Sequence, residues 1–358
     1  MAELPGQAAV LGRLRRDLDR LALRTRAGLK HLAGVGRPQV GVSPRDLVWQ
    51  RDKARLYRYR SDQRRIRQPI LLVMSLVTKP YVFDLSPGNS FVESLLARGF
   101  DVYAVDWGVP DVVESENTLE TYCDEYLPRA CAAVLDESDA DAVTVYGYCL
   151  GGVLSLLFAA ANPDLPVGSL VLMTTPVDLS RLGPAMAILR DGRLDPDELI
   201  DETGNVPMEL VFDMFRVMKI TGDISAYAEL VRHLDNSAFV AGHQAIFQWA
   251  HDHIPFPGAT FRQIVRQFLR DEQLLRGRVE LAGRPVDLRD IACPVLNLTG
   301  AADQIIPPES NAPLLALVEG IDNLQLAAGH AGLIVGRSAQ RQTIPAIAEW
   351  IEAHSEAS

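Results

Sequence analysis

The chain has no long hydrophobic run. Its longest apolar stretch, residues 69–77 (PILLVMSLV), is about half as long as the roughly 20 residues that a membrane-spanning helix needs. The first residues, MAELPGQAAV, also lack the basic and apolar segments of a secretory signal. We therefore expect a soluble, cytoplasmic protein with no transmembrane segment.

Cysteine is scarce as well. The four cysteines among 358 residues are Cys123, Cys131, Cys149 and Cys293. No two of them have the CxxC spacing of redox motifs and zinc sites, so we expect no metal. We also expect no bound organic cofactor. Because the chain has no export signal, its thiols are expected to be reduced. The question is then whether one of these cysteines is reactive.

The composition is that of an ordinary globular protein. Hydrophobic residues make up 48% of the chain and charged residues 23%, which excludes a wholly disordered, collagen-like or coiled-coil protein. The length allows one large α/β domain with an inserted subdomain.

Charge is unevenly distributed. Residues 1–68 hold 17 basic and 6 acidic side chains, although the whole chain has a net charge of −11. Within this region, residues 8–34 have the apolar spacing of an amphipathic helix, so we predict a basic helical arm over 1–45. The arm is either a solvated helix or a surface for an acidic partner, an anionic surface or the acidic body of the chain. Nucleic acid is not expected as a partner, because no recognisable nucleic-acid module accompanies the charge.

Strands and helices are expected to alternate from about residue 69. The apolar runs predict strands and the intervening segments predict helices, which indicates a mostly parallel, doubly wound α/β sheet. Strands are expected at 69–76, 101–106, 142–146, 169–174, 293–299 and 323–326, and helices at 90–98, 119–135, 150–161 and 344–353.

The alternation is interrupted between the fourth and fifth of these strands. Residues 178–288 indicate helices and loops with no convincing strand, and they are rich in aromatic side chains and histidine. We predict a helical cap over this segment, inserted into a core formed by residues 46–177 and 289–358.

The segment Gly147-Tyr148-Cys149-Leu150-Gly151-Gly152 carries the strongest chemical signal. It lies between a predicted strand and a predicted helix, which is the context of the G-x-nucleophile-x-G elbow. The glycines omit Cβ atoms that would collide in so sharp a turn. The turn therefore exposes Cys149 at the top of the sheet, at a helix N-terminus that favours the thiolate.

Two downstream residues complete a candidate triad in the chain order of α/β hydrolases: nucleophile, acid, histidine. Asp303 follows the strand at 293–299, and His330 follows the strand at 323–326 on a loop of small residues. His251 and His253 are rivals, but they fall in the predicted cap rather than at a strand end. For the oxyanion hole we predict the backbone amides of Leu150 and Val77.

At these residues the chain resembles the polyhydroxyalkanoate synthases of the α/β-hydrolase superfamily, most closely the short catalytic subunits of class III or IV. The resemblance spans about residues 45–352. Its most specific parts are the elbow cysteine, where ordinary esterases have serine, and the stretch that ends in Asp106-Trp107-Gly108. It also includes CPVLNLTGAADQIIPPES (293–310) and the segment at 329–336, whereas Gln304 stands where the family often has histidine.

The resemblance implies polymerisation of (R)-3-hydroxyacyl-CoA, such as 3-hydroxybutyryl-CoA, into polyhydroxyalkanoate with release of CoA. It implies that Cys149 carries the acyl chain, that His330 activates the thiol, and that Asp303 activates the substrate hydroxyl. The expected partners are a companion synthase subunit, further copies of the chain in a homo-oligomer, and the surface of polyester granules. Two alternatives stay open: a cysteine-dependent depolymerase or thioesterase on the same fold, and a non-catalytic granule-associated binding protein.

Overall fold

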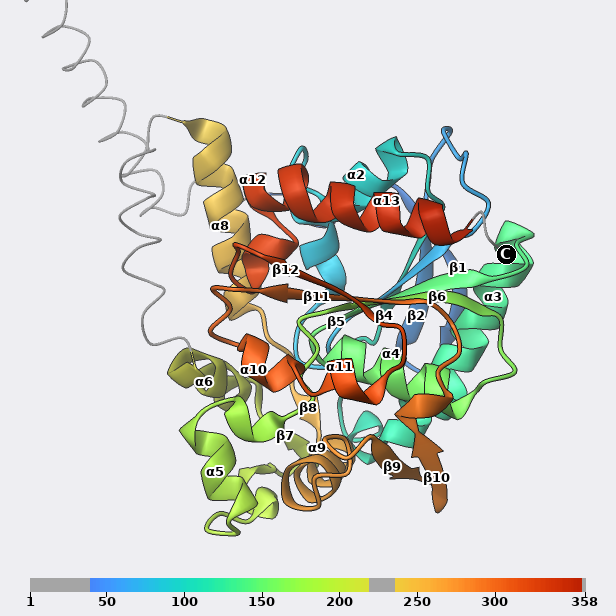
Figure 1. Cartoon of the computed structure of the whole chain (residues 1–358). Helices are drawn as coiled ribbons and strands as arrows, with labels where there is room; N and C mark the ends of the chain where they lie inside the picture. Colours follow the sequence, from blue (N-terminus) through green and yellow to red (C-terminus); the bar gives the residue numbers. More distant parts are fainter. Residues whose placement is uncertain (1–38, 219–235, 356–358) are drawn as a thin grey trace, which may run out of the picture.

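The computed structural model describes residues 39–218 and 236–355 (Figure 1). The amphipathic helix expected at 8–34 lies outside the described residues, so the basic arm stays a prediction.

A single eight-stranded sheet runs through the centre of the protein. Its strand order is β1-β2-β4-β3-β5-β6-β11-β12. Strand β2 runs antiparallel to β1 and β4, and the other neighbouring pairs are parallel, which confirms the doubly wound α/β class. The strands are β1 (Arg45–Arg51), β2 (Ala54–Tyr59), β3 (Ile70–Val73), β4 (Val102–Asp106), β5 (Val143–Tyr148), β6 (Val167–Met173), β11 (Val295–Gly300) and β12 (Asp322–Leu326).

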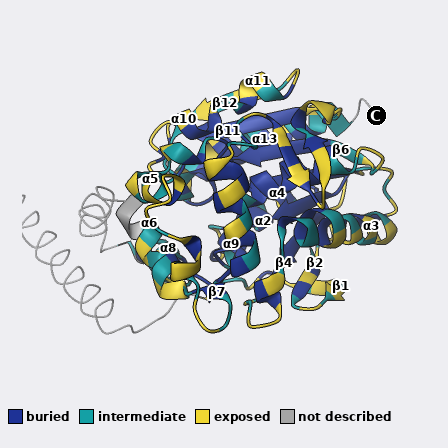
Figure 2. Cartoon of the chain, turned by 90° about the horizontal axis from the view of Figure 1, so that it is seen from below, coloured by how far each residue is buried: buried dark blue, intermediate teal, exposed yellow. Residues whose placement is uncertain are grey.

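Helices cover both faces of this sheet, and each face has its own apolar core. In Figure 1, α2 and α13 lie on one side of the sheet, and α3 and α4 lie on the other. Helix α4 is buried along almost its whole length (Figure 2), which is why its sequence is nearly all apolar. The helices of the core are α2 (Phe91–Ala97), α3 (Leu127–Ser138), α4 (Leu150–Ala161), α10 (Pro308–Asn311), α11 (Leu314–Leu317), α12 (Gly336–Ser338) and α13 (Ile344–Ser355).

Two details of the core differ from the sequence prediction. The strand expected at 69–76 ends at Val73, because the chain then turns across the top of the sheet, where the Trp107 indole N–H donates to the Met74 carbonyl over 2.9 Å. Strands β1 and β2 were not predicted at all. They are the edge strand and its neighbour, both only partly buried and in an arginine-rich stretch, so their apolar pattern is weak.

Between β6 and β11 the chain forms a separate layer of helices and short strands outside the central sheet. The expectation that this segment has no strand is wrong, since it contains two small two-stranded sheets. These strands are too short to give a periodic pattern, and the β9–β10 turn at Ala282-Gly283, with φ of 50° and 77°, lacks an Asn-Gly or Asp-Gly signal. The elements of this layer are α5 (Pro184–Arg190), β7 (Asn205–Val206), α6 (Met208–Met218), α8 (Ser237–His251), β8 (Phe256–Pro257), α9 (Gly258–Ile264), β9 (Arg278–Leu281) and β10 (Arg284–Asp287).

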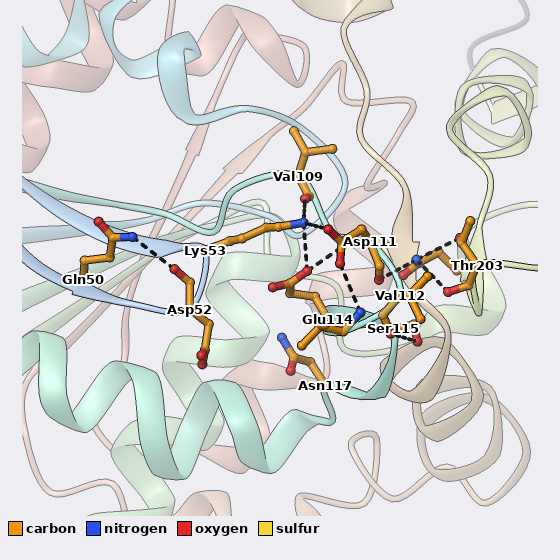
Figure 3. Close-up of polar contacts among 12 residues, drawn as sticks. Gln50, Asp52, Lys53, Val109, Asp111, Val112, Glu114, Ser115, Asn117 and Thr203 are labelled. Atoms are coloured by element: carbon orange, nitrogen blue, oxygen red, sulfur yellow. Dashed lines mark hydrogen bonds and ion pairs between the residues drawn. The ribbon is translucent and has the colours of Figure 1, made fainter.

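A polar cluster ties this layer to the edge of the sheet (Figure 3). Lys53, in the β1–β2 turn, binds Asp111, the Val109 carbonyl at 3.0 Å and Glu114 at 3.0 Å. The Asn205 side chain of β7 donates to the Asp111 carbonyl over 3.0 Å. These contacts fix β7 beside the end of β4. Among the described residues, no helix is both long and apolar enough to cross a membrane.

Candidate active site

Cys149 lies in a strained turn between β5 and α4. Its backbone has φ of 56° and ψ of −123°, and its N–H donates to the Met173 carbonyl over 2.9 Å. A positive φ is uncommon for a residue with a side chain and marks a position that the surrounding structure enforces. The strand, turn and helix around Cys149 have the form of a nucleophile elbow.

The elbow glycines are required by close packing. A Cβ atom on Gly151 would lie 2.2 Å from the Val73 carbonyl oxygen, and one on Gly147 would lie 2.5 Å from the Gly152 Cα. Real Cβ contacts are essentially never so short. Helix α4 therefore begins directly against the ends of β3 and β5, which brings Cys149 close to the loop after β3.

Asp303 and His330 come together from the loops after β11 and β12. The Asp303 Oδ2 lies 2.8 Å from the His330 Nδ1. The Asp303 Oδ1 accepts the backbone N–H groups of Ile305 and Ile306, both at 2.9 Å. The side chain of His330 also makes a hydrogen bond with Cys149. The structure thus brings together the three residues that the sequence singled out, while the neighbouring Gln304 is exposed.

The electrostatics of His330 favour its charged form. Burial by itself lowers the pKa of His330, but the adjacent Asp303 carboxylate and the hydrogen bond to Cys149 together raise it well above its usual value. An imidazolium next to a cysteine stabilises the thiolate, which is the nucleophilic form of the side chain.

Replacing Asp303 with Asn is expected to change how stability depends on pH. Because the folded-state pKa of His330 lies above its unfolded value of about 6.5, protonated His330 stabilises the fold fully below that pH. This stabilisation is lost as the pH rises through the folded-state pKa. Wild type should lose more free energy of unfolding between pH 6 and pH 10 than Asp303→Asn, by more than about 1.4 kcal/mol, the equivalent of one pKa unit.

Urea unfolding at several pH values measures this difference. Asp322→Asn is the matched control, because Asp322 pairs with the half-exposed His354 at 3.9 Å and lies outside the site. The control should follow wild type across the whole pH range. Parallel curves for wild type and Asp303→Asn would show that Asp303 does not control the protonation of His330.

Tyr148 is a site residue that the sequence did not single out. Its ring centroid lies 4.9 Å from that of His330, and its hydroxyl donates to the His330 carbonyl over 3.3 Å. Tyr148 is fully buried under the imidazole and thus holds the loop of His330 in place. Its position next to the nucleophile was the only available signal.

Cys149 lines an apolar cavity of about 140 Å³. Its wall consists of side chains from the sheet ends and from the layer between β6 and β11, among them Phe215, Phe256, Phe261 and Phe268. All four lie in the segment 178–288, which the sequence marks as rich in aromatic side chains. Apart from Cys149 itself, Ser75 is the one polar side chain among the lining residues.

Both predicted oxyanion residues, Leu150 and Val77, line this cavity together with Cys149. The Val77 carbonyl accepts the Ile254 N–H and the His253 Nδ1–H, each at 3.1 Å. Nearby, the Trp249 indole N–H donates to the Lys79 carbonyl over 3.0 Å. The end of α8 and the segment after it therefore fix the backbone of the loop that follows β3.

The two rival histidines have other contacts. His251 is exposed and its Nδ1 bonds to the Phe247 carbonyl at 2.7 Å. His253 is buried, and burial lowers its pKa, which leaves a neutral ring stacked on Phe215 with centroids 5.0 Å apart. The imidazole that bonds to Asp303 is that of His330.

The remaining cysteines lie in environments that keep the thiol protonated. Burial raises the pKa of Cys123 well above its ordinary value, that of Cys131 to about 12 and that of Cys293 to about 11. None of the three lines the cavity. Within the described ranges, no group of three or more His, Cys, Asp or Glu side chains is arranged to hold a metal ion.

Comparison with known proteins defines the class first. The α/β hydrolase fold family matches residues 68–336, well over half of the chain. Among solved structures, the monoacylglycerol lipase of Paleococcus ferrophilus is similar with a TM-score of 0.50 and 20% identity, covering 84% of this chain and 99% of the lipase. The chain has the α/β hydrolase fold, as the sequence predicted.

The curated relatives then define the family. The family described as Poly-beta-hydroxybutyrate polymerase (PhaC) N-terminus matches residues 5–95. The poly(3-hydroxyalkanoate) polymerase subunit PhaC of Allochromatium vinosum is 36% identical over 90% of this chain and 92% of its own length. The subunit of the same name from Synechocystis is 32% identical over 91% and 89%. The chain belongs to the PhaC family of poly(3-hydroxyalkanoate) polymerases and is an enzyme, an acyltransferase.

Proposed function

We propose that this protein polymerises (R)-3-hydroxyacyl groups from their CoA thioesters, with the growing chain held on Cys149 and CoA released. The observation that carries this proposal is the position of Cys149. It lines an apolar cavity and is hydrogen-bonded to a histidine that a buried carboxylate orients. A thiol suits this chemistry, because exchange between a thiol and a thioester is close to thermoneutral.

The first step transfers the acyl group. His330 takes the proton of Cys149, and the sulfur attacks the thioester carbonyl carbon. The tetrahedral oxyanion is stabilised by the backbone amides of Leu150 and Val77. The carbon–sulfur bond to CoA then breaks, and His330 returns the proton to the CoA thiolate as it leaves.

The second step extends the polyester. The 3-hydroxyl of another acyl-CoA attacks the thioester on Cys149, His330 accepts the hydroxyl proton, and the sulfur of Cys149 departs. The extended chain is then a CoA thioester, and Cys149 attacks it as in the first step, which releases CoA and returns the chain to the sulfur. We assign to Asp303 the orientation of His330 rather than direct activation of the hydroxyl. Both carboxylate oxygens are already engaged, one by His330 and one by the amides of Ile305 and Ile306.

The apolar cavity supports polymerisation over hydrolysis. Water that reached the acyl-cysteine would end the chain, and a wall of phenylalanine and aliphatic side chains disfavours ordered water there. The modest volume of about 140 Å³ favours a short acyl group such as 3-hydroxybutyryl. None of these steps requires a metal or a bound organic cofactor. Self-association, a companion subunit and contact with the surface of polyester granules belong to the same proposal.

Incubation of the full chain with CoA thioesters of different lengths tests the proposal. We expect CoA release together with insoluble polyester from 3-hydroxybutyryl-CoA, and at least about ten-fold slower release from 3-hydroxydecanoyl-CoA because the cavity is short. CoA release with free 3-hydroxybutyrate and no polymer would instead identify a thioesterase. Stoichiometric binding without turnover would indicate the granule-associated binding protein.

A further inference from the structure

Ser75 is a buried polar residue without a partner. It is 2% exposed, and its hydroxyl makes no hydrogen bond within the described part of the chain. An unsatisfied buried hydroxyl is destabilising, so its persistence calls for an explanation. Ser75 lines the cavity at Cys149, where it is the only polar side chain besides the nucleophile.

The backbone holds Ser75 next to the elbow. Ser75 follows Met74, whose carbonyl carbon would lie 2.8 Å from a Cβ atom placed on Gly151. The same Met74 carbonyl accepts the Trp107 indole N–H at 2.9 Å. The segment before Ser75 is thus packed against the start of α4 on one side and pinned by an indole on the other. Ser75 is therefore held by its backbone beside the elbow, in the wall of the same cavity as Cys149.

The chemistry of a 3-hydroxyacyl group matches this hydroxyl. Such a group has two oxygens near the sulfur: the thioester carbonyl oxygen, which can only accept hydrogen bonds, and the 3-oxygen, which in the free hydroxyl both donates and accepts. In the proposed mechanism the backbone amides of Leu150 and Val77 donate hydrogen bonds to the carbonyl oxygen. The 3-hydroxyl is then the oxygen without a partner in an otherwise apolar cavity.

We propose that the Ser75 hydroxyl hydrogen-bonds the 3-hydroxyl of the incoming acyl group, so that Ser75 determines specificity for 3-hydroxylated thioesters. This inference rests on the proposed function and extends it. A site built to pair with a substrate hydroxyl discriminates strongly against an analogue without one, because the buried group of the protein is left unpaired when the analogue binds.

Single-turnover acylation with paired substrates tests the inference. Wild type, Ser75→Ala and Ser75→Thr are mixed with 3-hydroxybutyryl-CoA or butyryl-CoA, and both CoA release and the mass of the acylated protein are followed. For Ser75→Ala we expect acylation by 3-hydroxybutyryl-CoA to slow 10- to 100-fold, about 1.4–2.7 kcal/mol. Acylation by butyryl-CoA should stay within about two-fold. Ser75→Thr keeps a hydroxyl and should keep the preference for the hydroxylated substrate.

Thr343→Val is the matched control. Thr343 is another buried hydroxyl without a partner among the described residues, but it precedes α13 and does not line the cavity. Its replacement should leave the rates with both substrates unchanged. A general loss of folded protein would lower the rates of acylation by 3-hydroxybutyryl-CoA and by butyryl-CoA equally. The ratio of these two rates within one variant is therefore unaffected by such a loss.

The outcomes separate this inference from the proposed function. An equal loss with both substrates in Ser75→Ala would overturn the inference, since Ser75 would then act on the carbonyl or on packing. No loss with either substrate would overturn it as well. A wild-type protein that 3-hydroxybutyryl-CoA does not acylate would overturn the proposed function, and the inference with it.

Discussion

Replacing Cys149 with Ala is expected to abolish CoA release and polymer formation, with a loss of at least about 10³-fold. The sulfur is the group that accepts the acyl chain in the proposed mechanism, and no other residue of the site can replace it as a covalent carrier. Intact-protein mass spectrometry after incubation with 3-hydroxybutyryl-CoA should show the acyl adduct on wild type and none on Cys149→Ala.

The other cysteines provide controls for this result. Cys123→Ala, Cys131→Ala and Cys293→Ala should each keep activity within a few-fold, because these thiols lie outside the cavity and burial keeps them protonated. Full activity in Cys149→Ala would instead show that another residue is the nucleophile. A wild-type protein that binds polyester granules but has no enzymatic activity would favour the binding-protein alternative.

His330→Gln is expected to lower the rate of acylation by about 10²- to 10⁴-fold, the range that a positioned general base contributes. Glutamine retains a donor for the 2.8 Å contact with Asp303 but cannot transfer the proton of Cys149. Alkylation of Cys149 by iodoacetamide gives a second readout. Wild type should be alkylated faster than the variant at the same pH, because the variant lacks the base that takes the proton of Cys149.

His354→Gln is the matched control for this substitution. His354 lies on the surface of α13, stacked on Trp350 with centroids 4.1 Å apart, and has no contact with the site. Its replacement should change neither acylation nor alkylation. If His330→Gln kept the wild-type alkylation profile, His330 would not be the base for Cys149.

Much of the candidate site was predictable because its signals are local. The elbow Gly147-Tyr148-Cys149-Leu150-Gly151 follows a strand and precedes a helix within one short segment, so nearby residues specify its turn. Asp303 and His330 were predicted from their positions at the ends of β11 and β12. The carboxyl ends of parallel strands meet at one edge of a sheet, which brings residues far apart in the sequence together.

The parts that sequence reasoning missed have weak local signals. Strands β1 and β2 alternate only partly between buried and exposed side chains, and arginines interrupt the apolar pattern. The β7–β8 pair has two residues in each strand, too few for any period to appear. These elements depend on neighbours that the rest of the fold supplies.

The sequence by itself determined the α/β class, the strained turn at Cys149 and the chain order of nucleophile, acid and histidine, because each depends on a short segment or on strand order. Only the tertiary structure decided what surrounds them. His253 reaches the Val77 carbonyl across 176 residues of sequence, and the cavity wall is assembled from segments on both sides of β7. The solitary hydroxyl of Ser75 became visible in the same way, because burial and the lack of a partner are properties of packed neighbours rather than of any one stretch of chain.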